Sequence, residues 1–80
     1  MYLEILTPDS KVYSGEVEAV KLPGADGSFG VLKNHAPIIA TLKKGIVKIT
    51  DTKKQVENFE IGGGVVEVLN NKIIVLAENA

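Results

Sequence analysis

The 80-residue sequence contains no cysteine, no tryptophan and only one histidine, His35. Without cysteine the chain has neither a disulfide nor thiolate chemistry, which fits a reducing compartment. A transition-metal site gathers several histidine, cysteine or carboxylate ligands, and a single histidine without cysteine argues against one. We therefore expect no metal and no disulfide to support this fold.

Long apolar runs and an excess of positive charge are also lacking. The longest wholly apolar run covers residues 73–77, far short of the roughly 20 residues that a membrane-spanning helix needs. The N-terminus has no basic start followed by an apolar run, as a signal peptide would. The formal net charge is −1, whereas nucleic-acid-binding modules usually show a clear basic excess. The sequence predicts a cytoplasmic chain with no membrane insertion and no nucleic-acid partner.

The sequence does contain short stretches in which apolar and polar residues alternate with a period of two. Val47 and Ile49 alternate with Lys48 and Thr50, for example, and β-branched residues are abundant. Such alternation is typical of strands with one buried face. The predicted strands cover residues 2–7, 17–22, 38–42, 46–50, 56–61, 65–69 and 73–77.

Turn residues separate these stretches at short intervals, and no segment shows helical spacing over three turns. We expect Ser14-Gly15 to bend the segment before residue 17. Residues 73–77 are apolar on both faces, which predicts a central strand or one that a partner covers. The sequence predicts a single all-β domain over residues 1–80, a small β-sandwich or flattened barrel of about 8–10 short, mostly antiparallel strands without a substantial helix.

Catalytic chemistry finds little support in the residues. The acids fall in turns, as Asp9, Asp26 and Asp51 do, or on outward strand positions, as Glu60 and Glu67 do, where they serve turn formation and solubility. The glycines at 24, 27 and 30 and at 62–64 lead into strand-like residues, whereas a phosphate-binding loop leads into a helix. We predict no catalytic residue, no cofactor and no metal, and therefore not an enzyme.

The segment 27–37 combines two glycines, His35 and Pro37, a cluster that a core strand does not need but a loop of fixed shape does. His35 has two compatible interpretations. Its ring could bond nearby backbone and rigidify the turn before Pro37, or it could contact a docking partner. The alternative function is a generic β-sandwich interaction module or a lipoyl- or biotin-carrier domain. A carrier domain would place Lys44 or Lys53 at a hairpin tip, but Met1 is the only methionine and the flanking residues do not match.

Several motifs in fixed order resemble a known family. They are a Gly-x-x-Gly loop at 27–30, His-Ala-Pro at 35–37, Leu-Lys-Lys-Gly-Ile-Val at 42–47 and Gly-Gly-Gly-Val-Val-Glu-Val at 62–68, flanked by similar segments at 3–9, 12–17 and 75–80. Together they resemble the N-terminal β-sandwich domain of the F-type ATP synthase epsilon subunit. The resemblance covers essentially all 80 residues.

The resemblance implies a non-catalytic rotor subunit of the central stalk, on the cytoplasmic side of the cell membrane as a peripheral part of the complex. Its implied partners are the gamma subunit and the c-ring, and its role is to couple ion-driven rotation to ATP synthesis. Many relatives continue into two helices that inhibit hydrolysis, and some bind ATP there. The sequence stops before them, either because the native protein lacks the helices, as some members do, or because it has been cut there. We expect a chain that couples rotation without helix insertion or ATP binding.

The resemblance also implies which residues meet each partner. Ser28 stands where relatives frequently carry an acid, and Lys33-Asn34 replaces the usual Pro-Gly before the histidine. Asparagine can still adopt the left-handed conformation that such a turn requires. The implied c-ring contacts are Gly27, Ser28, Phe29, Gly30 and Val31, and the implied gamma-subunit contacts are His35, Ile38, Ala40 and Leu42.

Overall fold

A computed structural model describes residues 1–79 of the chain, and every regular element in that range is a β-strand. In chain order the strands are β1 (Tyr2–Leu6), β2 (Lys11–Leu22), β3 (Phe29–Leu32), β4 (Ile38–Leu42), β5 (Gly45–Asp51), β6 (Val56–Ile61), β7 (Gly64–Leu69) and β8 (Lys72–Ala77). The prediction of an all-β fold of short strands without a substantial helix is confirmed.

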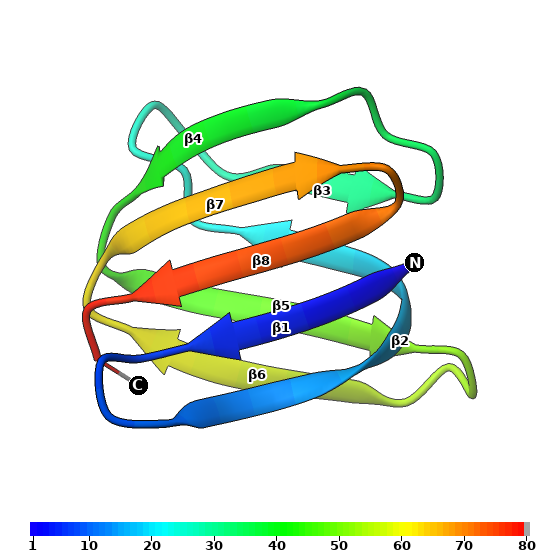
Figure 1. Ribbon diagram of the computed structural model, residues 1–80, viewed down its shortest axis with the longest axis horizontal. Helices are drawn as coiled ribbons and strands as arrows, with labels where there is room; N and C mark the ends of the chain where they lie inside the picture. The colour runs from blue at the N-terminus through cyan, green and yellow to red at the C-terminus, as the bar shows by residue number, and fades with distance from the viewer. Residues whose placement is uncertain (80) are drawn as a thin grey trace.

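The strands form two layers that share one long strand. The front sheet has the order β4-β7-β8-β1 and ends on the first half of β2, and the back sheet contains β3, the second half of β2, β5 and β6. Figure 1 shows the front sheet facing the viewer, with β5 and β3 behind it. Since β2 belongs to both layers, the sandwich is a curled half-barrel.

Six of the seven strand pairings are antiparallel, as predicted, and only β1 and β8 pair in parallel. The bend predicted at Ser14-Gly15 is wrong in position. Both residues lie inside the twelve-residue strand β2, where Gly15 pairs with Leu3, and the register against β5 shifts only between Val17 and Ala19. The sheet therefore bends where β2 changes layer, after the glycine.

Strand β3 was absent from the predicted strands, because residues 27–37 read as one shaped loop. In the structure Phe29–Leu32 pairs with the end of β2, with Leu22 opposite Phe29. The bounds of β4 and β6 agree with the predicted ranges, and β2 starts six residues earlier than its predicted range. A four-residue strand that contains a glycine gives too little alternation to be recognised in the sequence.

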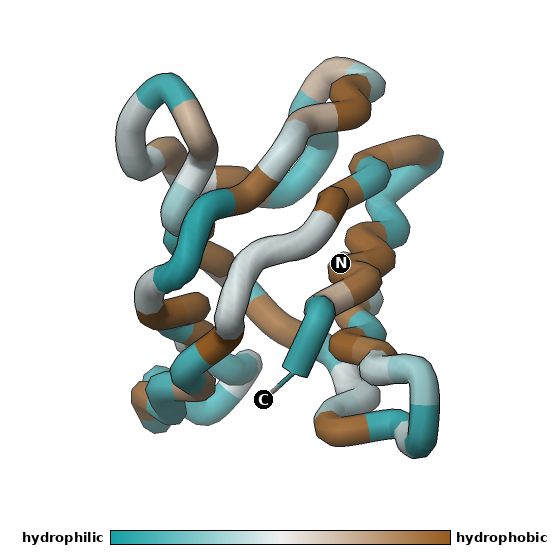
Figure 2. The backbone as a smooth tube through the Cα atoms, turned by 90° about the vertical axis from the view of Figure 1, so that its left-hand side faces the viewer, coloured by the Kyte–Doolittle hydropathy of each residue, from teal (hydrophilic) through white to brown (hydrophobic). Residues whose placement is uncertain are grey.

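The core lies between the two layers and is wholly apolar. Among the described residues no polar or charged side chain is buried. Val47, Ile49, Val66 and Val68 are buried and Glu67 is exposed, which confirms the predicted alternation. Figure 2, which views the end where the C-terminus lies, shows hydrophobic and hydrophilic positions alternating along the backbone. Burial of one side of each strand supplies the main driving force for folding.

The half-barrel has two sides at which strand edges face each other. On one side the rings of Tyr13 on β2 and Phe59 on β6 pack edge to face, with centroids 5.6 Å apart. Burial there raises the pKa of the Tyr13 phenol, and the nearby charges of Glu57 and Asp51 raise it further. On the other side the only described bridge to the outer edge of β4 joins Leu42 to Gly24. The first side is thus closed by aromatic packing, while most of β4 remains a free edge.

Candidate functional site

The predicted c-ring segment divides between an exposed turn and a strand. Gly27 and Ser28 are exposed in the turn, and Gly30 is exposed on the outer face of β3. Val31 has no exposed surface and belongs to the core, so its prediction as a contact residue is wrong. Phe29 is half-buried and packs against the core. Three of the five residues therefore offer surface to a partner.

The turn that carries Gly27 and Ser28 has a fixed shape. The amide of Gly27 donates to the carbonyl of Gly24 over 3.0 Å, and the amide of Ala25 donates to the carbonyl of Thr41 over 2.9 Å. A Cβ added to Gly24 would lie 2.5 Å from the Gly27 carbonyl oxygen and 2.8 Å from the ring of Phe29. The glycine is thus required by close packing, and the turn is tied to the end of β4.

His35 lies in a second turn, at the opposite end of β3 and β4 (Figure 1). The His35 amide donates to the Leu32 carbonyl over 3.1 Å, and its ring Nδ1 lies 2.6 Å from the Ala36 carbonyl oxygen. Since a carbonyl only accepts, Nδ1 carries the proton in this contact. Asn34 has a φ of 62°, which confirms that asparagine takes the left-handed conformation. The structural interpretation of His35 is confirmed, since its ring bonds the backbone before Pro37.

On β4, the residues predicted to contact gamma point toward the core. Leu42 is 3% exposed and belongs to the core, so it has no surface to offer and its prediction as a contact is wrong. Ile38 and Ala40 are half-buried against the core, while Ile39 between them is 74% exposed. Because side chains alternate along a strand, an outward contact from β4 uses Ile39 and Thr41. The positions predicted on β4 are therefore the inward ones.

The outer face of the front sheet carries an apolar surface that the sequence prediction did not assign to any partner. We define the front patch as Ile39, Val65, Leu69 and Leu76, which are 74%, 40%, 46% and 54% exposed, together with the half-buried Leu6 and Ile74. The strand register places Val65 beside Leu76, and Leu76 beside Leu6. The signal in the sequence was the run 73–77, which is apolar on both faces. β8 is indeed a central strand, and it still exposes Leu76.

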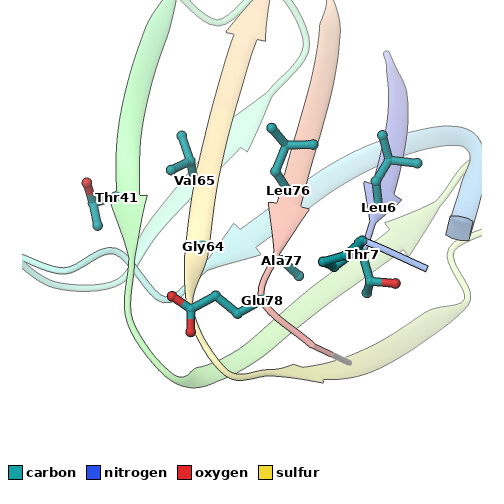
Figure 3. Close-up of a pocket in the computed structure, with 9 residues that line it drawn as sticks. Leu6, Thr7, Thr41, Gly64, Val65, Leu76, Ala77 and Glu78 are labelled. Carbon is teal, nitrogen blue, oxygen red and sulfur yellow. The ribbon is translucent and has the colours of Figure 1, made fainter. Parts of the chain in front are cut away.

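A shallow hollow of about 540 Å³ lies at one end of the front patch. Figure 3 shows Thr41, Val65, Leu76 and Leu6 in a row across four strands, with Glu78 below the row beside Gly64 and Ala77. The hollow also borders on Gly64, which lacks a side chain. A mainly apolar concavity with a carboxylate at its rim suits an apolar side chain that is followed by a basic one.

The charges on the front face are only partly paired. Glu4 lies 2.9 Å from the ammonium of Lys11 and 3.8 Å from that of Lys72, and the hydrogen bond to Glu4 raises the pKa of Lys11. Within residues 1–79, Glu67 and Glu78 take part in no ion pair. Two free carboxylates beside the front patch favour a partner surface that carries basic residues.

The residues that the structure describes give no sign of a metal centre or a membrane span. No group of three or more histidine, cysteine, aspartate or glutamate side chains in this range lies close enough to hold a metal ion. The same range contains no helix long and apolar enough to cross a membrane. The arrangement consists of exposed surfaces on a rigid fold, and such surfaces are suited to docking.

Comparison with known proteins identifies the family. The profile described as "ATP synthase, Delta/Epsilon chain, beta-sandwich domain" matches residues 1–80. The chain therefore belongs to this family of β-sandwich domains from the delta and epsilon chains of ATP synthases. It is 49% identical over 78 residues to the ATP synthase epsilon chain of Sulfurimonas denitrificans, covering 98% of this chain and 60% of that one. It is 46% identical over 77 residues to the epsilon chain of Chlorobium limicola, covering 96% of this chain and 88% of that one.

A solved structure supports the fold independently of close sequence similarity. A chain in the Euglena gracilis mitochondrial ATP synthase, resolved as OSCP, F1 and c-ring, superimposes with a TM-score of 0.91 at 20% identity. The match covers 96% of this chain and 49% of that chain. The relatives thus differ in length, and this chain spans from about half to most of them. The β-sandwich is the part that they share.

Proposed function

We propose that this chain is a non-catalytic subunit of the central stalk of an F-type ATP synthase and couples rotation of the c-ring to the catalytic head. The observation that carries the proposal is the match along the whole chain to epsilon chains, at 40–49% identity among those compared. A core packed as densely as an organic crystal deforms little under load, which suits a rotor element.

In this proposal the subunit is peripheral, on the cytoplasmic side of the membrane, and its two partners meet different surfaces. The gamma subunit covers the free edge of β4 and the adjoining front patch. An edge strand without charge or proline is an aggregation hazard unless it is covered, and Ile38–Leu42 has neither. His35 supports this surface by holding the turn before β4. The c-ring meets Gly27 and Ser28, in the turn before β3, and Gly30 on β3 itself.

The direct test is co-purification. The chain expressed with gamma and the c-ring subunit of its own organism is expected to purify with both in a stoichiometric complex. A carrier domain would instead bring an enzyme that lipoylates or biotinylates lysine, and the native mass of the chain would show the adduct. Recovery of the chain without gamma, from cells in which the rest of the complex assembles, would contradict the proposal.

The Ser28→Arg variant tests the c-ring contact separately. Ser28 is exposed at a turn of fixed shape, so arginine there leaves the fold intact and introduces a bulky charge at the proposed contact. We expect gamma binding to persist, while ATP-driven proton pumping by the reconstituted enzyme falls about tenfold, because the long arginine side chain keeps the turn from close contact with the ring. Lys53→Glu, in the β5–β6 turn at the other end, is the matched control. Unchanged pumping with Ser28→Arg would show that the turn does not face the ring.

A further inference from the structure

Two lysines stand side by side on the outer face of the back sheet. Lys21 on β2 pairs directly with Lys48 on β5 in the antiparallel register. Both side chains are exposed, and within residues 1–79 neither takes part in an ion pair. Like charges directly opposite each other on one sheet face are destabilising. We call Lys21 and Lys48 the basic pair.

Acidic neighbours do not compensate the basic pair. Glu18 is engaged by Lys54 at 2.8 Å. Glu60 lies on the same outer face but pairs with Ile46, and Asn58 stands opposite Lys48. The chain thus keeps an uncompensated positive charge at the centre of a sheet, where its own fold offers no benefit.

On β3, the position that pairs with Lys21 carries no side chain. Gly30 on β3 is the register partner of Lys21, and its backbone does not adopt a positive φ. A Cβ there would meet only the Val20 carbonyl oxygen, at 4.0 Å. Neither backbone conformation nor space therefore requires glycine. Its lack of a side chain leaves a depression of about 280 Å³ that includes both lysines and Ser28 on its walls.

We propose that the basic pair and the bare surface at Gly30 form a docking site for a carboxylate side chain of the partner that meets the Gly27–Ser28 turn. The inference rests on the proposed function, in which that partner is the c-ring. Ser28 belongs both to this turn and to the depression, so the two contacts are continuous. The positive charge of the pair selects a carboxylate, and its two ammonium groups can both donate to one.

The outer face of the front sheet, on the opposite side of the sandwich, favours a partner of the opposite charge. The front patch lies beside the free carboxylates Glu67 and Glu78, whereas the back face presents the basic pair. The two faces would therefore distinguish partners by charge, and a subunit docked in the wrong orientation would meet like charges. Such repulsion provides specificity in addition to the attractive contacts.

The test measures binding of the chain, in complex with gamma, to the detergent-solubilised c-ring at about 50 mM and about 300 mM NaCl. The Lys21→Met/Lys48→Met variant keeps the aliphatic stems and removes both charges. We expect about tenfold weaker binding at the lower salt and a smaller salt dependence. Lys33→Met/Lys53→Met, which removes two exposed lysines from the far end of the fold, is expected to bind like the wild type.

Folding is monitored in the same variants by thermal unfolding. Removal of a like-charge pair leaves the melting temperature unchanged or raises it, so weaker binding by the Lys21→Met/Lys48→Met variant reports on docking. Wild-type affinity and salt dependence in this variant would overturn the inference and leave the proposed function standing. Failure of the wild type to bind the ring would overturn both. Self-association of the wild type that this variant abolishes would assign the face to a second copy and also overturn the inference.

Discussion

Substitution of Gly64 by alanine is expected to destabilise the domain by about 2–4 kcal/mol. Gly64 begins β7 with a φ of 150°, a conformation that side chains with a Cβ rarely adopt. The added Cβ would also overlap the carbonyl oxygen of Leu76 on β8. The backbones of Gly64 and Leu76 both belong to the paired strands β7 and β8 of the front sheet, so neither can move away without loss of strand pairing. Thermal or urea unfolding of the isolated chain measures the effect.

The matched control is Gly30→Ala, on β3. Gly30 has an extended backbone, and the new Cβ would meet nothing closer than 4.0 Å. Alanine there reduces the entropy of the unfolded chain, so we expect stability within about 0.5 kcal/mol of the wild type or slightly above it. Equal losses at both positions would show that glycine is not needed for the backbone of β7.

Substitution of Leu76 by lysine is expected to weaken gamma binding by at least about thirtyfold, the effect of losing a central interface residue. Leu76 is 54% exposed in the front patch, between Val65 and Leu6 (Figure 3). Lysine removes apolar area and adds a positive charge where the free carboxylates indicate a basic partner. Titration calorimetry of the isolated chain with gamma measures the change.

Two variants keep this prediction specific. Leu76→Met preserves the apolar contact and should bind like the wild type. Val56→Lys places the same charge on β6, at a residue that is 52% exposed in the back sheet, and should also bind gamma normally. The isolated Leu76→Lys chain should unfold at nearly the wild-type temperature, because the side chain lies outside the core. Wild-type affinity in this variant would remove the front patch from the interface.

The sequence predicted the fold class and most strands because period-two alternation records one-sided burial directly. Val47 and Ile49 show why, since both are buried while Ile46 and Lys48 beside them are exposed. Strand β3 was not predicted because it is short and contains Gly30. The position of the bend in β2 could not be predicted from the sequence either. That bend depends on β2 leaving β1 for β5, a long-range choice that local residue types do not record.

The predicted contact residues come from the resemblance, which carries over positions along the chain and not their exposure in this fold. Leu42 and Val31 are therefore among the predicted contacts, although both side chains face the core. For a strand such as β4, the sequence alone does not show which alternate positions face inward. The front patch is assembled from strands that are distant in the sequence, so neither Val65 nor Ile39 could be connected with Leu76 before the topology was known.

The parallel pairing of β1 with β8 has a consequence for synthesis. Tyr2 lies opposite Lys72, and Leu6 lies opposite Leu76. One of the two neighbours of β1, the first strand, is therefore β8, the last strand. Until β8 has left the ribosome, β1 lacks the neighbour on its side away from β2, and β7 lacks the neighbour on its side away from β4. Such distant pairing is slow to form, and it leaves unpaired edges exposed meanwhile. We therefore expect the domain to fold only once β8 has left the ribosome, and nascent chains that end before β8 to depend on chaperones.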